Sequence, residues 1–317
     1  MCTSLPALLL ASVGATAQEL YALWGGQHTQ SPDENTYSYS FEYLHNVNEH
    51  LVASFTWLNE GHVTNHHRDG HGLQLWYRWL TPERRWTFSL GAGPYRYYDT
   101  TVTEASENST DAHGWGVMGS VAAHWYFHYP WVLQLRYNYT YTATSITTQT
   151  YELGFGYQFD RASRPGPVVP PAQYGFTFPE RSEVTAMIGE SIVNNFHSPS
   201  GTAWAVEYRY RLTPYIHATG TVIDEGDASI VKRKGVTAEI WLVREFIDRA
   251  SLGLGVGPYL AHDADDNGSR ILFLGFFTME LGYRWSQRWG TRLYWYRTVT
   301  TNGRDSDVLM LGMGYNF

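Results

Sequence analysis

The chain has 317 residues, of which 16% are charged and 16% aromatic, with a formal net charge of −8 and a mean hydropathy of −0.35. The negative charge argues against a basic nucleic-acid-binding surface, so we predict no nucleic-acid partner. After residue 20 no run approaches the roughly 18 apolar residues that a membrane helix needs. A transmembrane β-barrel fits this composition, because its strands alternate lipid-facing apolar residues with inward polar ones.

The first residues have the pattern of an export signal. Residues 5–14 form a short apolar core, and Ala15-Thr16-Ala17 is an A-x-A cleavage site. We therefore predict a signal peptide at 1–17 and a mature chain that starts near Gln18. The single cysteine, Cys2, excludes a disulfide framework and a cysteine-based metal site, and we predict no cofactor.

The first half of the mature chain alternates apolar and polar residues in segments bounded by turn residues. Tyr37, Tyr39 and Phe41, for example, alternate with Ser38 and Ser40. Tilted strands of about 9–11 residues span a bilayer. We predict strands at 19–29, 35–46, 50–61, 71–81, 86–98, 112–127, 131–143 and 149–159.

The connections between these strands alternate in length. Short turns are predicted at 46–50, 81–85 and 128–130, and longer polar loops at 28–35, 61–72 and 99–111. Outer-membrane barrels have short periplasmic turns and long outward loops. We therefore expect a bacterial outer-membrane protein with its N- and C-termini in the periplasm.

The second half repeats the first. The matched pairs are Glu60 with Glu225, Gly70 with Gly235 and Trp76 with Trp241 at an offset of 165, residues 91–95 with 255–259 at 164, and residues 154–159 with 312–317 at 158. The repeat predicts a further eight strands at 183–196, 202–213, 215–225, 234–246, 250–262, 270–285, 289–300 and 306–317.

The repeat sets the predicted organisation of the chain. We expect an all-β fold of antiparallel transmembrane strands, with eight-stranded units at 18–160 and 183–317. The proline-rich stretch 161–182 is predicted to be an extended periplasmic linker. This linker favours two small barrels, and a single sixteen-stranded barrel is the alternative. The last strand ends on Tyr315 and Phe317, which resembles the sorting signal that the outer-membrane barrel assembly machinery recognises.

Three groups of polar residues are candidate sites. Charged and amide side chains on the inward faces predict a buried network. The segment after Glu60 offers imidazole and carboxylate groups that suit Zn, Cu or Ni, although their spacing matches no compact motif and we favour a solvated loop. Three cations in the second half could pair with lipopolysaccharide phosphates, with a generic positive loop as the alternative. These residues are, in order, Glu42, Gln74, Arg78, Arg136, Glu152, Glu207 and Glu239; His62, His66, His67, Asp69 and His71; and Lys232, Arg233 and Lys234.

Two acidic residues recur at equivalent strand ends. Glu60 matches Glu225, and Asp99 matches Asp263. A shared site at each barrel mouth would explain this recurrence. Ordinary hydrogen bonding at strand ends would explain it equally, and we favour that interpretation.

The Gly-x-Gly-Pro-Tyr motif at 91–95 and the Gly-x-Gly-Tyr-x-Phe motif at 154–159 resemble those of small outer-membrane barrels related to the lipid A 3-O-deacylases, the PagL-like barrels. The resemblance implies an eight-stranded barrel in each half. Active members of that family carry a His-x-Ser pair on strand seven, followed by an acidic residue. Here Tyr139 and Tyr141 occupy the His and Ser places, and 294–298 in the second copy also lacks the pair. We therefore carry over no catalytic residues.

These patterns together predict a non-catalytic envelope anchor or interaction module with loops at the cell surface. The expected partners are outer-membrane lipid, lipopolysaccharide, the barrel assembly machinery and an envelope or surface protein. A sixteen-stranded passive diffusion pore is the first alternative. A lipid A-modifying hydrolase of the PagL-like type is the second.

Overall fold

The computed structural model describes most of the chain after residue 17. The predicted signal peptide lies outside the described residues, as does most of the predicted linker. Within the described part, no helix is long and apolar enough to cross a membrane. The described ranges are 18–102, 109–160, 164–168, 180–195, 197–228, 231–246, 249–265, 268–300 and 303–317.

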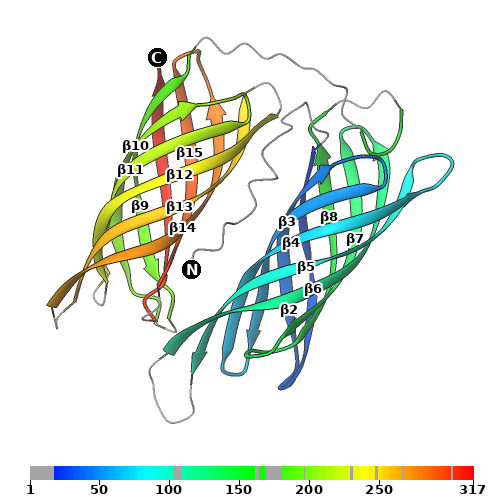
Figure 1. The fold of residues 1–317 in the computed structure, drawn as a ribbon, viewed down its shortest axis with the longest axis horizontal. Helices are drawn as coiled ribbons and strands as arrows, with labels where there is room; N and C mark the ends of the chain where they lie inside the picture. Colours follow the sequence, from blue (N-terminus) through cyan, green and yellow to red (C-terminus); the bar gives the residue numbers. More distant parts are fainter. Residues whose placement is uncertain are drawn as a thin grey trace, which may run out of the picture. The chain divides into compact units, whose positions relative to one another are not determined.

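The first half of the chain forms a closed barrel of antiparallel strands in chain order (Figure 1). The last strand pairs back onto the first, with Trp24 opposite Leu153. The strands are β1 (Gln18–Gln30), β2 (Asp33–Asn46), β3 (Leu51–Val63), β4 (His66–Leu80), β5 (Trp86–Val102), β6 (Ser109–His128), β7 (Trp131–Thr142) and β8 (Thr148–Gln158).

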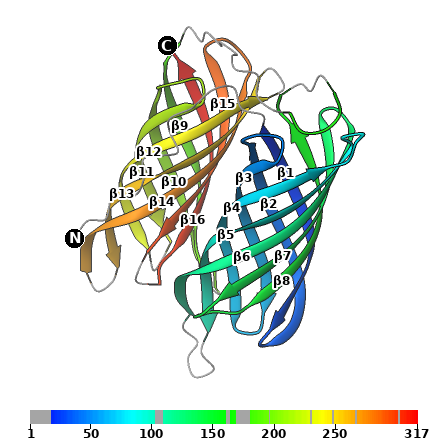
Figure 2. The same ribbon diagram turned by 45° about the vertical axis from the view of Figure 1, so that its right-hand side comes forward.

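The second half forms a separate closed barrel, also of eight strands (Figure 2). Leu309 of its last strand pairs with Glu190 of its first. The prediction of two small barrels is confirmed, and the single sixteen-stranded barrel is wrong because each ladder closes on itself. The strands are β9 (Ser182–Val193), β10 (Ser200–Arg211), β11 (Ile216–Asp227), β12 (Lys232–Phe246), β13 (Ala250–Asp265), β14 (Gly268–Arg284), β15 (Trp289–Val299) and β16 (Ser306–Asn316).

Each barrel has two distinguishable ends. We call the end at which β1 begins and β8 ends, or β9 begins and β16 ends, the terminal end, and the opposite end the distal end. At the distal end, two loops predicted at 28–35 and 61–72 are wrong. The β1–β2 ladder runs to the pair Gln30 and Asp33, and the β3–β4 ladder to Val63 and His66, so only two residues connect each pair. Polar residues do not end these strands, because strands that project beyond lipid can be polar on both faces.

The outer faces of both barrels carry large apolar side chains. Leu135 and Phe155 of the first barrel are each 60% exposed, and Phe273 of the second is 78% exposed. An apolar surface that encircles a barrel would be unstable in water and is suited to hydrocarbon. Both are therefore membrane-spanning barrels of the outer-membrane type. Other exposed members of this surface are Leu73, Leu75, Phe88, Leu90, Leu153, Ile188, Val256, Leu260, Ile271 and Leu311.

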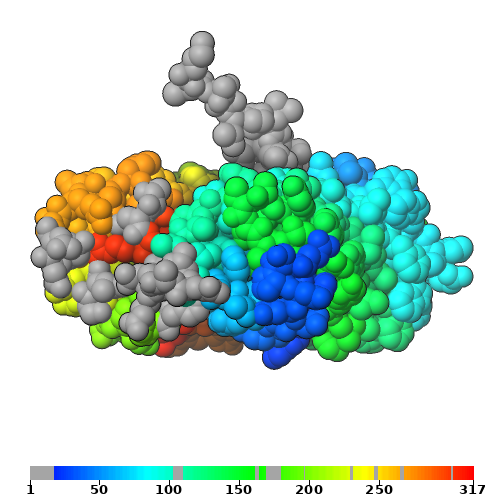
Figure 3. Space-filling model, turned by 90° about the horizontal axis from the view of Figure 1, so that it is seen from below, coloured from blue at the N-terminus to red at the C-terminus, as the bar shows by residue number. Residues whose placement is uncertain are grey.

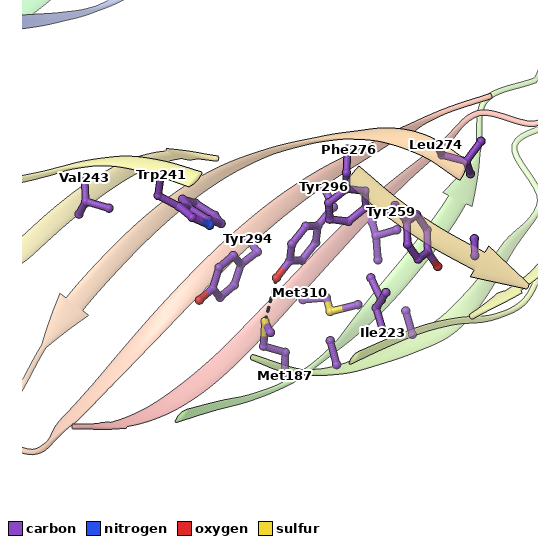
Figure 4. Packing of buried hydrophobic residues seen from close by; sticks show 14 residues of the cluster. Met187, Ile223, Trp241, Val243, Tyr259, Leu274, Phe276, Tyr294, Tyr296 and Met310 are labelled. Carbon is purple, nitrogen blue, oxygen red and sulfur yellow. Dashed lines mark hydrogen bonds between the residues drawn. The ribbon is translucent and has the colours of Figure 1, made fainter. Parts of the chain in front are cut away.

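The interiors of the two barrels differ in chemistry. The second contains an apolar cluster in which the rings of Tyr294, Tyr296 and Phe276 lie 5.2–5.3 Å apart in succession (Figure 4). The Tyr296 hydroxyl also donates to the sulfur of Met187 at 3.1 Å. The first barrel is filled mainly by polar side chains, with smaller apolar clusters. Side chains rather than water therefore occupy much of each lumen, as expected for eight strands.

Part of the predicted linker lies against the terminal end of the first barrel. The Gln158 amide donates to the carbonyl of Gly166 at 3.0 Å, and the Asn46 amide donates to the carbonyl of Val168 at 3.3 Å. Arg164 pairs with Glu49 at 2.7 Å. Residues 164–168 are thus docked on the barrel rather than extended away from it.

Glycines on the inner face make room for the buried tryptophans. A Cβ added to Gly91 would lie 2.3 Å from the ring of Trp76, whereas one added to Gly119 on the outer face would meet nothing within 4 Å. We expect Gly91→Val to destabilise the first barrel by about 1–3 kcal/mol because the extra atoms overpack the lumen. Urea unfolding in detergent measures this change. Gly119→Val is the control and should stay within about 0.5 kcal/mol of the wild type; equal effects would contradict the packing argument.

Candidate functional site

The distal end of the first barrel is filled by a buried ion pair. The Arg68 guanidinium, on β4, bonds both carboxylate oxygens of Glu60 on β3, with the Nη2 contact at 2.7 Å. The Tyr95 hydroxyl donates to the same carboxylate at 2.9 Å, and Thr148 also donates to it. All four polar groups are buried inside the barrel. Because the pair is surrounded by hydrogen-bond partners, its desolvation is compensated.

A second carboxylate completes this cluster in the first barrel. One oxygen of Asp99, on β5, contacts the Nδ1 atom of His66 at 2.8 Å and accepts from Ser145 at 2.7 Å. Ser145 also accepts from Arg68 at 3.1 Å. This Ser, His and Asp do not form a nucleophile and base, because Ser145 donates to the aspartate and not to the imidazole.

The second barrel builds the same arrangement at its distal end. Arg233 on β12 pairs with Glu225 on β11 at 3.3 Å, and Ser306 donates to that carboxylate at 2.6 Å. Arg304 pairs with Asp263 at 3.2 Å. Arg233 also donates to the Arg304 carbonyl at 2.8 Å. Both carboxylates are buried, so this end of the lumen is likewise filled by charged groups.

The shared residues define the distal cluster of each barrel. The prediction of ordinary strand-end hydrogen bonding missed the arginine, although Arg68 and Arg233 have the same offset of 165 as the glutamates they bind. That common offset was the sequence signal for the pair. The matched members are Glu60 with Glu225, Arg68 with Arg233, Tyr95 with Tyr259, Asp99 with Asp263 and Thr148 with Ser306.

The β1–β2 and β7–β8 regions are neighbours at the distal end of the first barrel. In Figure 3, which looks from below, blue atoms of the β1–β2 region and green atoms of the β7–β8 region lie side by side. The ladder joins these elements as far as Thr29 and Thr148. The carbonyl of Ile146, just before β8, accepts from Arg68, so the charged cluster also holds this edge of the mouth.

The interior residues predicted in the first barrel all lie inside it. Arg136 pairs with Glu42 at 2.6 Å and donates to Gln74 at 2.7 Å. Glu152 accepts from Ser40 at 2.9 Å, and Arg78 donates to Asn46 at 2.8 Å. Further buried members of this network were not predicted: Glu19, Tyr126, Gln134 and Asn138.

The interior of the second barrel contains a separate network. Arg209 pairs with Glu207 at 2.9 Å and with Glu280 at 2.5 Å. The predicted Glu239 accepts from Thr278 at 2.7 Å. The sequence analysis predicts Glu207 and Glu239 here, and it missed Arg209 and Glu280. Glutamates recur at matched levels from the terminal to the distal end of each barrel: Glu19, Glu42 and Glu60 in the first, and Glu183, Glu207 and Glu225 in the second.

The barrel wall separates the candidate metal ligands. His62 and His67 stack on the outer face with ring centroids 4.0 Å apart, whereas His66 points into the lumen toward Asp99. Neighbouring residues of a strand point to opposite faces, so adjacent histidines cannot share one ion. His71 and Asp69 lie on the outer face. Among the described residues, no three His, Cys, Asp or Glu side chains are placed to hold a metal.

The three candidate lipopolysaccharide-binding cations do not share a surface. Lys232 and Lys234 are exposed on the outer face of β12, and Lys232 pairs with Asp227 at 3.0 Å. Arg233 is fully buried in the distal cluster, so its assignment to a surface contact is wrong. Strand alternation again explains the difference, because the predicted loop is part of a strand.

Two further groups of residues from the sequence analysis lie on the outer faces of the barrels. One is the pair of tyrosines at the His and Ser places of the PagL-like motif, and the other is the aromatic end of the chain. Tyr139 and Tyr141 face outward, with Tyr141 54% exposed, and the corresponding stretch 294–298 of the second copy contains neither His nor Ser. Phe317 is exposed and its ring lies 6.4 Å from that of Tyr315. The outward aromatic face expected of a sorting signal is therefore present in the last strand.

No protein-family model matches the chain, and no curated protein matches it in sequence. Among solved structures, the N-terminal barrel domain of Pseudomonas aeruginosa OprF aligns at 15% identity and a TM-score of 0.38, covering 46% of this chain and 99% of that one. Neisserial surface protein A aligns at 13% and 0.35, covering 45% and 97%. The attachment invasion locus protein of Yersinia pestis aligns at 12% and 0.35, covering 46% and 99%. Each aligned region is less than half of this chain.

The buried pair of the distal cluster makes a stability prediction. We expect Arg68→Met to destabilise the first barrel by about 3–5 kcal/mol, because Glu60 would remain buried without its counter-charge. Urea unfolding followed by tryptophan fluorescence measures the change. Glu49→Gln, which breaks partly exposed pairs with Arg84 and Arg164, is the control and should cost about 1 kcal/mol or less. A cost for Arg68→Met as small as that of the control would rule out a structural role for the pair.

Proposed function

We propose that the chain is an integral outer-membrane protein whose two barrels are closed, non-catalytic anchors. They would hold their distal hairpins at the cell surface, in contact with lipopolysaccharide. The observation that carries the proposal is the distal cluster. The same buried Glu, Arg and Asp recur in both barrels although the surrounding outward residues differ, which supports a common role in closing each lumen.

The charged groups inside each barrel support a closed lumen. In the first barrel, Tyr126 bonds Glu19 at 3.2 Å near the terminal end, Arg136 pairs with Glu42 midway, and Arg68 of β4 donates to Thr148 of β8 at 3.0 Å at the distal end. Groups that bond across the lumen at three levels leave little room for a continuous column of water. A sixteen-stranded pore would need one sheet that includes all sixteen strands, and the strands instead close into two separate sheets of eight.

The proposed orientation places the terminal ends in the periplasm. In the first barrel, β1 begins and β8 ends at that end, which suits a barrel that is inserted from the periplasmic side. The outward Tyr315 and Phe317 support recognition by the barrel assembly machinery. The distal hairpins would then lie at the cell surface.

The exposed lysines support a contact with lipopolysaccharide. Lys232 and Lys234 lie on the outer face at the distal end of β12, where the phosphates of the outer leaflet would lie in the proposed orientation. A cation beside an anionic lipid surface contributes favourably to binding, and the effect weakens with salt.

The hydrolase alternative finds little support in the same residues. Tyr139 and Tyr141 face outward without an imidazole partner, and Ser145 donates to Asp99 rather than to His66. The PagL-like resemblance is therefore proposed for the barrel fold and not for the activity. An unchanged lipid A mass spectrum after expression is the result that we expect.

A closed lumen predicts electrical silence. We expect the purified full-length protein to give no stable conductance steps in planar bilayers, because charged side chains fill each lumen. A porin inserted in the same bilayers serves as the positive control. Regular steps that scale with the amount of inserted protein would rule out the closed-barrel proposal.

The lipopolysaccharide contact predicts a charge effect. We expect Lys232→Gln combined with Lys234→Gln to weaken lipopolysaccharide binding roughly thirtyfold at low salt, since each lysine near an anionic surface is worth about 1 kcal/mol. Binding to the detergent-solubilised protein at two salt concentrations measures this. Arg181→Gln, which changes an exposed cation at the terminal end, should leave binding unchanged. Equal losses from the two changes would contradict a contact at the distal end.

A further inference from the structure

The outer face of the first barrel carries a cationic and aromatic patch near its distal end. We call it the Arg96 patch, and it consists of Arg96, Tyr98, Trp115, His71 and His113 on β4, β5 and β6. The Arg96 guanidinium lies 5.8 Å from the ring centroid of Tyr98 and 5.4 Å from that of Trp115. The His71 and His113 rings meet the Tyr98 ring edge-on at 5.4 and 5.5 Å.

The charge of Arg96 is not balanced by a nearby carboxylate. In the part of the chain that the structure describes, no carboxylate lies within 4.0 Å of its guanidinium. Asp69, one of the acidic residues of this face, accepts from the indole of Trp57 at 3.2 Å on the opposite side of β4. An arginine that faces hydrocarbon is destabilising, and the penalty falls toward the membrane interface. Arg96 therefore needs an anion from its surroundings at the level of the headgroups.

The second barrel shows that the fold itself does not require this patch. His71 is paired with Arg96 in the β4–β5 ladder, and the equivalent pair in the β12–β13 ladder is Val236 with Leu260. Phe273, at an offset of 158 from Trp115, is paired with Leu260. Leu260 is 50% and Phe273 78% exposed, as an ordinary lipid-facing surface would be.

We propose that the Arg96 patch is a lateral binding site for a phosphate of lipid A. A guanidinium forms charge-assisted, bidentate hydrogen bonds with phosphate. Tyr98 and Trp115 would hold the guanidinium in place by cation–π contact, and His71 and His113 add ring nitrogens beside it. The proposal rests on the proposed function in one respect, that the distal end faces the outer leaflet. It concerns a different barrel from the lysine contacts described above.

The test compares lipid A binding by full-length variants in detergent. Arg96→Leu introduces the residue that the second barrel has at this place, so heat-modifiable gel migration should be retained. We expect it to weaken binding of lipid A about tenfold, the usual effect of losing one charge-assisted hydrogen bond. Arg270→Leu on β14 is the control, because this arginine is also accessible (47% exposed) but lies 3.9 Å from the lumen-facing carboxylate of Asp263; the change should alter binding less than twofold.

A second variant covers the case in which Arg96→Leu fails to fold. Trp115→Phe also introduces the residue of the second barrel and should weaken lipid A binding severalfold, because phenylalanine gives a weaker cation–π contact than tryptophan. Unchanged affinity in a folded Arg96→Leu protein would overturn the proposal. If that protein does not fold, unchanged affinity in Trp115→Phe would overturn it.

The lipid arms of the experiment identify the source of the phosphate. Dephosphorylated lipid A should bind wild type and Arg96→Leu equally, and phosphatidylglycerol micelles should bind the wild type at least tenfold more weakly than lipid A. Equal binding of phosphatidylglycerol would overturn the assignment to lipid A. These measurements involve neither conductance nor orientation in a membrane. Unchanged lipid A affinity in the Arg96 variants would overturn the Arg96 proposal and leave the closed-barrel proposal intact. Conductance in planar bilayers would overturn the closed-barrel proposal and leave the Arg96 result unaffected.

Discussion

The closure of each hydrogen-bonded ladder is the constraint on which the rest of the structure depends. Hydrocarbon offers no partner to a backbone amide or carbonyl, so a membrane-spanning sheet must pair its edges with each other. Pairing of β8 with β1 and of β16 with β9 meets this requirement within each half of the chain. Once eight strands close, the lumen is narrow and its inward side chains must pack together. Every inward charge then needs an internal counter-charge or a hydrogen-bond partner.

The two barrels meet that need in partly different ways. At the distal ends they use the same pairs, Glu60 with Arg68 and Glu225 with Arg233. Midway, Glu42 is paired with an arginine from β7, whereas Glu207 is paired with Arg209 from its own strand. The space that remains is filled by polar groups in the first barrel and by the aromatic cluster of Figure 4 in the second. The glutamates are thus kept at matched levels while their midway partners and surroundings differ.

The fold could be predicted from the sequence in detail, because strand alternation and an internal repeat are both periodic signals. Most strand boundaries fell within about two residues of those observed. The distal hairpins were missed because polarity was interpreted as the end of a strand, although it marks only the end of the lipid-facing region. The same error placed Arg233 on the surface and grouped His62 with His66 across the barrel wall. The Glu60–Arg68 pair could have been found, since both residues recur at one offset, but the repeat alone does not show which side chains meet.

The tight distal hairpins also bear on how this surface can change. In the β1–β2 and β3–β4 hairpins the ladder continues to within two residues of the tip. One inserted residue in an arm would exchange the inward and outward faces of the positions beyond it unless a bulge absorbs it, as one does between Asn59 and His62 of β3. In the β3–β4 hairpin such an exchange would turn Glu60 or Arg68 out of the lumen. Length variation in these hairpins should therefore be tolerated in steps of two residues per arm, and single substitutions on the outward positions should be the easier route to a new surface. A molecule that binds there would also meet a preformed ribbon, with little loop entropy to lose on binding.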